Sequence, residues 1–356
     1  MNDETQDLLA RYQPQEAKVV DAPRQLCAAR FAPCGNFLLA GGFDGLVYRW
    51  DASSKDLPQL PSLAGHQGWV QGLAFHPREL RAYTADTWGR LCCWPYAEAV
   101  PQPAWSIDPA HDGWIRAIAV SPDGGQLATC GTDRVLRMWS SLDGSKLQEI
   151  SGPTDDPYCL AFHPDGRSLV TGDLRGVVRH WDLATAKCIR EFDARLLFAY
   201  MQIQELGGVR VLAFDREGKS LACGGAQPTM AANVQGIPTL LLFDWESGKQ
   251  TRSMALGKSA DGFVFDLLWH SDGFWMIVTS GGPGSGQLAF HRPADETPFF
   301  VSSKMSNCHA VSMHPSGKRL VVTATNRSSA GNGRPPKDGK YPSNWSPVHV
   351  LDFPQA

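Results

Sequence analysis

Histidine and cysteine are the residue types in this chain best suited to bind a metal ion or to act in catalysis, and the sequence contains 10 histidines and 9 cysteines. Four histidines share one position of a turn that recurs along the chain: His76, His163, His270 and His314. A residue type that returns at one position of several copies indicates a role in the turn itself. Cys92 and Cys93 are adjacent, so in a strand their side chains point to opposite faces. We therefore expect neither set to bind a metal ion.

Known catalytic and cofactor motifs are not found in the sequence. HExxH, paired CxxC and GxSxG do not occur in the context that each requires. The segment GGPGSG at 281–286 is rich in glycine, but it lacks the Lys-Ser/Thr ending and the following helix of a phosphate-binding loop. The sequence therefore predicts no catalytic residue, no metal and no cofactor.

A turn phrase between two apolar runs recurs seven times, typified by FHPDGRSLVT at 162–171. The seven copies begin at Phe31, Phe75, Val120, Phe162, Phe214, Trp269 and Met313. Successive copies start 42 to 55 residues apart, a spacing typical of one four-stranded sheet per repeat. A third apolar run follows in each copy and in most ends on an aromatic residue, at Trp50, Trp94, Trp139, Trp181, Phe243 and Phe290. The pattern predicts an all-β, seven-bladed β-propeller of four-stranded antiparallel blades.

The seventh repeat lacks a fourth strand of its own. The segment AKVVDA at 17–22 has the length and pattern of that strand, so we expect the N-terminal strand to pair with the last blade and close the ring. Residues 1–15 are expected to form a polar N-terminal tail, and residues 16–356 a single propeller domain. The expected blades are 24–63, 64–108, 109–151, 152–195, 208–256, 262–303, and 306–353 together with 16–22.

These repeats resemble the WD-repeat family of seven-bladed propellers over nearly the whole chain. Gly65-His66 matches the Gly-His dipeptide of the family, and Trp50-Asp51 and Trp181-Asp182 match its Trp-Asp ending. The wording of several repeats, such as SLVTGDLRGVVRHWD, is similar to bacterial WD-repeat proteins of the planctomycete type. The resemblance implies a propeller without an assigned activity.

The resemblance also implies a hydrogen-bonded chain that pins each blade. His111, Thr129, Asp133 and Trp139 stand at the positions of the family's His, Ser/Thr, Asp and Trp in the third blade. The corresponding roles are expected for His66, Trp50 and Trp181 in other blades. Two blades depart from the pattern, because Trp88 and Arg175 stand where the turn Asp would align.

Charge and cysteine content restrict the class of partner and the location. The net charge of −3 gives no basic surface field, so we expect no specific nucleic acid and no membrane as partner. An odd number of cysteines, mostly inside predicted strands, favours free thiols and a reducing compartment. The acidic, polar N-terminal segment has no apolar stretch of the kind found in secretory signals. These features predict a cytoplasmic protein; the oligomeric state stays open.

Long connections point to one face of the predicted ring. Connections from a fourth strand to the next blade, and those between second and third strands, share a face that we call the top face. The long insertions are expected there, over blades four to seven, at 193–208, 226–238, 281–286 and 326–346. Insertions in repeat arrays commonly lie on the binding face. The apolar run at 196–206 either packs on the propeller or contacts a partner, and the basic 326–346 connection either docks an acidic partner or stays a flexible, solvated loop.

The start of each innermost strand lies at the top end of the channel. The large or charged side chains expected there, joined by one from the 326–346 connection, are Trp69, Gln71, Trp114, Arg116, Tyr158, Arg210, Phe263, Phe265, His309 and Trp345. Binding interfaces are enriched in Trp, Tyr and Arg, which favours a binding surface for a protein or peptide. The alternative interpretation is that these aromatic side chains only cover the channel or pack under the loops.

The sequence thus predicts a non-catalytic scaffold that binds a protein or peptide partner on its top face. One alternative is a structural subunit of a larger assembly, which would use blade edges or the apolar 193–208 segment. A second alternative is a hydrolase or lyase centred in the channel, with Arg116, Asp156, Arg210 and His309 as the candidate groups.

Overall fold

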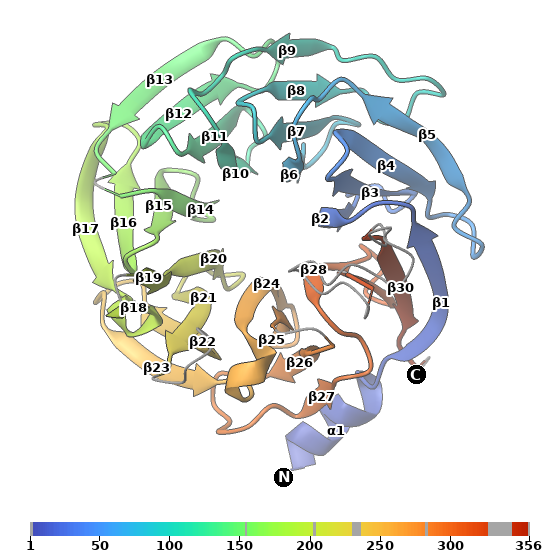
Figure 1. The fold of residues 1–356 in the computed structure, drawn as a ribbon. Helices are drawn as coiled ribbons and strands as arrows, with labels where there is room; N and C mark the ends of the chain where they lie inside the picture. Colours follow the sequence, from blue (N-terminus) through green and yellow to red (C-terminus); the bar gives the residue numbers. More distant parts are fainter. Residues whose placement is uncertain are drawn as a thin grey trace.

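The protein is a ring of seven antiparallel sheets around a central channel (Figure 1). The computed structural model describes residues 3–153, 155–201, 204–229, 236–281, 284–326 and 344–354. Each of the seven sheets formed by these residues has four strands, and the innermost strand lies beside the channel. The predicted seven-bladed, all-β propeller is confirmed.

The strands of a blade follow one another from the channel outward. Blades 1 to 3 consist of β2 (Leu26–Phe31), β3 (Phe37–Gly42), β4 (Leu46–Asp51) and β5 (Gln59–Ala64); β6 (Val70–Phe75), β7 (Ala82–Asp86), β8 (Leu91–Trp94) and β9 (Trp105–Ile107); and β10 (Ile115–Val120), β11 (Gln126–Gly131), β12 (Val135–Ser140) and β13 (Lys146–Ser151). Blades 4 to 6 consist of β14 (Pro157–Phe162), β15 (Ser168–Asp173), β16 (Val177–Asp182) and β17 (Lys187–Asp193); β20 (Val209–Phe214), β21 (Ser220–Pro228), β22 (Gly236–Asp244) and β23 (Gln250–Ala255); and β24 (Phe263–His270), β25 (Phe274–Ser280), β26 (Gly286–His291) and β27 (Phe300–Ser302). A short helix, η2 (Ser259–Asp261), joins blades 5 and 6.

The seventh blade combines the two ends of the described chain. Its inner strands are β28 (Cys308–Met313), β29 (Arg319–Ala324) and β30 (Ser346–Asp352), and its outer strand is β1 (Gln15–Ala22). β1 pairs with β30 in antiparallel register, from Gln15 opposite Asp352 to Ala22 opposite Ser346. The predicted closure of the ring by the N-terminal strand is confirmed.

A partly buried ion pair joins three blades at the same junction. Arg30 of blade 1 donates to both carboxylate oxygens of Asp266 in blade 6, at 2.6 and 3.0 Å. Asp266 also accepts the backbone N–H of Val311 in blade 7 at 2.9 Å. Bidentate Arg–carboxylate contacts of this kind are strong and directional. The pair therefore supports the closure from the inner side, while β1 supports it from the outer edge.

The segment expected to be a polar tail contains helix α1 (Asp3–Arg11), which packs beside blades 6 and 7 (Figure 1). Leu8 is 6% exposed and joins the apolar cluster of these blades. The Tyr12 ring meets His270 edge-on at 4.6 Å, and its hydroxyl donates to Asp272 at 2.8 Å. Leu8 and Tyr12 are one helical turn apart, and both pack against this cluster. No helix among the described residues is long and apolar enough to cross a membrane.

The recurrent turn histidines connect neighbouring blades. His163 Nε2 donates to the carbonyl of Gly218 in the next blade at 3.0 Å, and His314 Nε2 donates to that of Gly35 at 2.8 Å. Gly218 has φ +71°, and a Cβ there would lie 2.4 Å from His163 Nε2. The turn glycine thus provides both a left-handed conformation and room for the histidine of the preceding blade.

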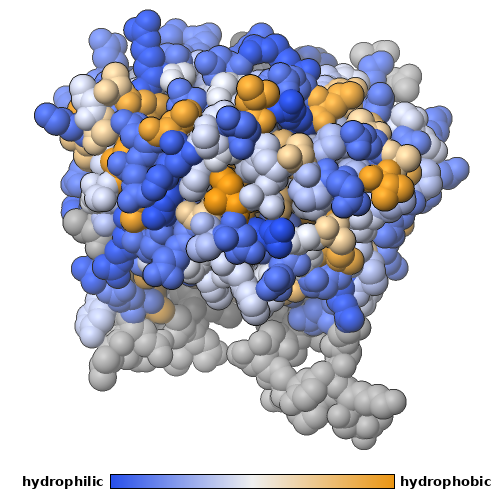
Figure 2. Space-filling view, turned by 90° about the horizontal axis from the view of Figure 1, so that it is seen from above, coloured by the Kyte–Doolittle hydropathy of each residue, from blue (hydrophilic) through white to orange (hydrophobic). Residues whose placement is uncertain are grey.

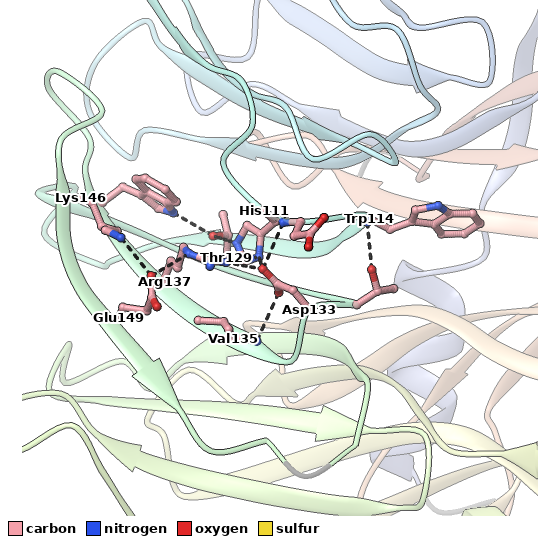
Figure 3. Close-up of polar contacts among 11 residues, drawn as sticks. His111, Trp114, Thr129, Asp133, Val135, Arg137, Lys146 and Glu149 are labelled. Atoms are coloured by element: carbon pink, nitrogen blue, oxygen red, sulfur yellow. Dashed lines mark hydrogen bonds and ion pairs between the residues drawn. The ribbon is translucent and has the colours of Figure 1, made fainter.

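Buried hydrogen bonds pin the strands of blade 3 (Figure 3). Thr129 Oγ1 accepts from Trp139 Nε1 at 2.8 Å and lies 2.7 Å from His111 Nε2. His111 Nδ1 lies 2.9 Å from Asp133, which also pairs with Arg137. Although burial raises the pKa of Asp133, hydrogen bonds from His111 and Arg137 hold it well below its ordinary value.

Two further blades have related hydrogen bonds that use a different carboxylate. In blade 2, Asp86 lies 3.0 Å from His66 Nδ1. Asp86 thus takes the role of the turn Asp, whose aligned position is occupied by Trp88. Burial raises the pKa of Asp86, but the hydrogen bonds that it accepts lower it to about 2. In blade 4, Asp173 pairs with Arg179 at 2.6 Å instead. The apparent departures at the turn are therefore compensated by an Asp at the end of the second strand.

Blade 1 lacks this pin. Trp50 is fully buried, and its indole N–H has no hydrogen-bond partner among the described residues. The register explains the difference, because Ala40 stands where blades 2 to 4 have a threonine. Trp50 contributes apolar packing only.

The connections on the face opposite the top face differ in length. The connection 95–104 between β8 and β9 has 10 residues, and 292–299 between β26 and β27 has 8. Arg49, only 1% exposed, donates to the backbone carbonyls of Glu98 at 2.7 Å and Ala99 at 3.2 Å. The first of these connections is therefore held against blade 1 by a buried guanidinium.

The 193–208 segment folds into a 3-10 turn, η1 (Arg195–Leu197), and a small hairpin, β18 (Phe198–Met201) with β19 (Gln204–Gly207). Leu197 is buried against blades 4 and 5, whereas Leu196 and Tyr200 are exposed. The segment thus packs on the propeller with one side and presents apolar groups to solvent with the other.

We expect a chain without residues 1–24 to lose cooperative unfolding, because it lacks the strand that closes blade 7. A chain without residues 1–13 loses α1 but keeps β1, so it should stay cooperative and melt moderately lower. Calorimetric melting of both truncations checks this. Unchanged cooperative melting of the chain without residues 1–24 would contradict closure by β1.

We expect Ala40→Ser to stabilise the protein by about 1 kcal/mol, because the new hydroxyl provides the missing acceptor for Trp50. Ala128→Ser is the matched control, since it buries a hydroxyl in a strand where Trp139 already has its partner, and it should destabilise. Chemical denaturation measures both changes. A loss of stability in both variants would show that the Trp50 indole is out of reach.

Candidate functional site

Seven β-bulges, one in each blade, surround the top end of the channel. In every blade the pairing of the two inner strands shifts by one residue near the start of the innermost strand. The extra residues, here called the bulge ring, are Cys27, Gln71, Arg116, Tyr158, Arg210, Phe265 and His309. All seven line one cavity of about 280 Å³ in the channel. A bulge redirects its side chain, and here it turns one side chain per blade toward the axis.

Three aromatic side chains extend this ring over blades 1 to 3. Phe43 stacks on Trp69 with ring centroids 4.3 Å apart, and Trp69 lies 5.8 Å from Trp114. Trp69 and Trp114 are 41% and 37% exposed, which leaves a large part of each indole open to solvent. We call Phe43, Trp69 and Trp114 the aromatic arc. It forms a half-exposed apolar rim next to the charged part of the channel.

The blade pins position the two tryptophans of the arc. Trp69 and Trp114 each follow a pinning histidine by three residues, in the segments HQGW and HDGW. The backbone N–H of Trp114 donates to Thr132 Oγ1 at 3.0 Å, and that of Trp69 donates to Thr87 Oγ1 at 3.0 Å. Figure 3 shows Trp114 pointing away from the pin, with its backbone held by this bond. A structural network thus fixes the backbone of a solvent-exposed aromatic group.

Arginine and aromatic side chains alternate along the next part of the ring. The guanidinium carbon of Arg116 lies 4.4 Å from the Trp114 ring centroid and 4.7 Å from that of Tyr158. The guanidinium carbon of Arg210 lies 4.5 Å from Tyr158 and 5.1 Å from Phe263. Cation–π contacts of this geometry hold the guanidinium planes against the rings.

The remaining part of the ring is neutral. Phe265 is 43% exposed, and its ring meets that of His309 edge-on at 5.2 Å. His309 Nε2 lies 2.5 Å from Thr325 Oγ1. Burial lowers the pKa of His309 to about 4, so the imidazole is uncharged at neutral pH. This side therefore adds an apolar wall rather than a further cation.

Comparison with known proteins agrees with this architecture. Residues 18–51, 103–140 and 144–182 match the family model described as WD domain, G-beta repeat. The chain carries WD40 repeats. Together with the seven blades, these matches define a WD-repeat propeller. The resemblance to bacterial members stays a prediction.

Relatives of this WD-repeat propeller are larger or only partly aligned proteins. Telomerase protein component 1 of Rattus norvegicus is 27% identical over 60% of this chain and 7% of its own length. Actin-interacting protein 1 of Drosophila melanogaster is 26% identical over 46% of the chain and 20% of its length. A guanine nucleotide-binding protein subunit beta of Zea mays is 23% identical over 66% and 64%. The aligned segments span less than two thirds of each relative.

Most of the site residues expected from the sequence lie together in the WD-repeat channel. The bulge ring contains Gln71, Arg116, Tyr158, Arg210, Phe265 and His309; the aromatic arc contains Trp69 and Trp114; and Phe263 contacts Arg210. Trp345 is not among the residues that line the cavity. It is half-buried, and its backbone N–H donates to Asn326 Oδ1 at 3.4 Å. The basic part of the 326–346 connection, at 327–343, lies outside the described residues, as do 230–235 and 282–283.

Three residues of the site were missed in the sequence. Phe43 lies in the connection between the second and third strands of blade 1. That connection is short, whereas only long connections were expected to indicate the binding face. Arg30 and Asp266 line the cavity from strands whose apolar pattern hides them. Only the proximity of blades 1, 6 and 7 reveals their ion pair.

Among the described residues of the WD-repeat propeller, we find no metal-binding group, and the Cys27 thiol of the bulge ring is not activated. No group of three His, Cys, Asp or Glu side chains there has the geometry to hold a metal ion. Burial raises the pKa of the Cys27 thiol far above its ordinary value, so it is not a thiolate at neutral pH. What the site offers is two guanidinium groups, aromatic faces and one neutral imidazole, which suit binding.

We expect Gly113→Ala to cost about 2–3 kcal/mol of stability. Gly113 has φ +103°, and a Cβ there would lie 2.6 Å from Thr132 Oγ1, the acceptor that holds Trp114. Gly273→Ala is the control, because Gly273 also has positive φ (+84°) but no atom within 4 Å of the new Cβ. It should cost only about 1 kcal/mol of conformational strain. Denaturant unfolding of both variants measures the difference, and equal costs would show that the space at Gly113 is not required.

Proposed function

We propose that this chain is a non-catalytic scaffold that binds a protein or a peptide at the top end of its channel. The observation that carries the proposal is the bulge ring, because seven separate blades each turn one side chain into the same cavity. Phe265 of this ring and the neighbouring Trp69 and Trp114 are half-exposed. Large, stiff side chains around a concave site are typical of binding hot spots.

The names of the relatives support a role in assembly. They denote a component of telomerase, a protein that interacts with actin and a subunit of a guanine nucleotide-binding protein. We transfer from them only the general role of protein binding. Nine free cysteines further support our proposal of a reducing, cytoplasmic location.

The carboxylate that lines the cavity and one at the start of blade 4 are occupied by ion pairs, which favours binding over acid–base chemistry. Asp266 holds Arg30, and Asp156 lies 3.0 Å from Arg134. A general base would have to give up such a pair to accept a proton. The outer edge offers a weaker alternative surface: on the side seen in Figure 2, hydrophobic residues lie scattered among hydrophilic ones.

We expect Trp69→Ala/Trp114→Ala/Phe265→Ala to lose the partner. Each hot-spot truncation should cost about 2 kcal/mol, which is about 30-fold in Kd. The measurement is affinity purification from an extract of the native cell, followed by titration of the purified partner. Melting curves check that the variant is folded.

The matched control is Leu142→Ala/Leu147→Ala/Ile189→Ala, which removes three exposed apolar groups outside the channel. This variant should retain the partner. Loss of the partner from the control alone would move the interface to the outer surface and favour a structural subunit. Equal retention by both variants would also refute the channel site.

A further inference from the structure

The channel cavity carries an excess of positive charge. Its permanently charged lining residues, among those described, are Arg30, Arg116, Arg210 and Asp266. His309 is uncharged at neutral pH, since burial lowers its pKa to about 4. The chain as a whole has a net charge of −3. The positive charge is therefore local to the channel and is not a property of the protein as a whole.

Only one of the three arginines is neutralised. Asp266 binds Arg30 through both oxygens and also accepts the Val311 N–H, so its acceptor capacity is largely used. Asp156, two residues before Tyr158, pairs with Arg134. Arg116 and Arg210 make no ion pair within the described part of the chain, and the Nε of each is buried without a hydrogen-bond partner there.

The two unpaired guanidinium groups lie close together. Each has its central carbon within 4.7 Å of the Tyr158 ring centroid. Burial lowers the pKa of Arg210 below its ordinary value; interaction with Tyr158 partly opposes this, and the charge of Arg116 adds to it. Arginine nevertheless stays charged in proteins. The protein thus holds two like charges together in a partly desolvated place, an arrangement that an anion would stabilise.

The stacking leaves suitable donors. A guanidinium that rests on an aromatic face keeps its N–H groups in its own plane, directed past the ring edge. Those donors match the two oxygens of a carboxylate in a bidentate contact. The cavity of about 280 Å³ has room for a side chain or a chain end of a larger partner.

Resting on the function proposed above, we propose that Arg116 and Arg210 bind a carboxylate of a peptide partner, from an Asp or Glu side chain or a C-terminus. The acidic group enters the channel beside the Tyr158 ring and accepts hydrogen bonds from the guanidinium groups that contact this ring. The apolar residues that flank it in the partner lie on Trp69, Trp114 and Phe265. The aromatic arc thus provides contact area, and the arginine pair selects acidic sequences.

The test uses two blocked peptides, acetyl-Gly-Leu-Glu-Leu-Gly-amide and the same peptide with Gln in place of Glu. Isothermal titration at low ionic strength should show at least tenfold tighter binding of the Glu peptide. Arg116→Met and Arg210→Met should each remove this preference. Equal affinity of the intact protein for both peptides would overturn the proposal.

Arg134→Met is the matched control, because Arg134 lies on the same side of the ring but already pairs with Asp156. It should keep the preference for Glu; loss of the preference would indicate a general charge effect and overturn the assignment. Inorganic phosphate is the second probe. If it binds as tightly as the Glu peptide and displaces it, the site recognises free anions and the peptide assignment is wrong.

Stability measurements separate binding from folding. Arg210→Met should melt no lower than the intact protein, since it removes one of two like charges. If it melts lower, Arg116→Lys and Arg210→Lys replace the methionine variants: they retain the charge, lose the planar fork and should reduce the preference at least threefold. An unchanged preference in both lysine variants would overturn the bidentate contact.

The experiments can reject the scaffold or the carboxylate site without rejecting the other. A partner that is lost with Trp69→Ala/Trp114→Ala/Phe265→Ala but bound normally by Arg116→Met/Arg210→Met supports the scaffold and refutes the carboxylate site. A Glu preference that depends on both arginines supports the carboxylate site even if the partner is captured through another surface.

Discussion

The structure depends on one constraint: each blade buries its two faces against its neighbours, so the ring must close before the first and last blades are fully buried. β1 meets this need at the outer edge by pairing with β30, and Arg30 with Asp266 meets it beside the channel. The turn histidines add hydrogen bonds between the turns of neighbouring blades. The closure is therefore supported at an outer strand, at an inner strand and at the turn that follows an inner strand.

This rigidity reaches the channel through the blade pins. His66 and His111 fix the second and third strands of their blades, and three residues later the same segments place Trp69 and Trp114 at the rim. A hydrogen-bonded core thus holds exposed aromatic groups that would otherwise lose conformational freedom on binding. Such preorganisation lowers the entropic cost of binding.

The bulge ring gives the channel its chemistry. A regular strand would alternate its side chains between the faces of a blade, toward the neighbours and away from the axis. The extra residue in each inner strand breaks that alternation once and turns one side chain inward. Side chains that are separated by more than 40 residues in sequence therefore meet in one cavity, and the identity of each can vary without disturbing the packing between blades. Two of these positions hold arginines that make no ion pair with the residues that the structure describes.

The sequence by itself determined the seven repeats, their strands, the closing segment and the rim residues, because repeat spacing and turn residues are local signals that every blade repeats. It also indicated the pin of blade 3, whose four side chains stand at fixed spacings. Only the tertiary structure decided that Asp86 and Asp173 replace the turn aspartates, that Trp50 has no acceptor among the described residues and that α1 packs on the ring. Only the fold, likewise, paired Arg30 with Asp266 and placed Arg116 and Arg210 beside Tyr158, without an ion pair in the described part of the chain. The physical reason is that these features depend on strand register and on contacts between blades, where residues far apart in the chain become neighbours.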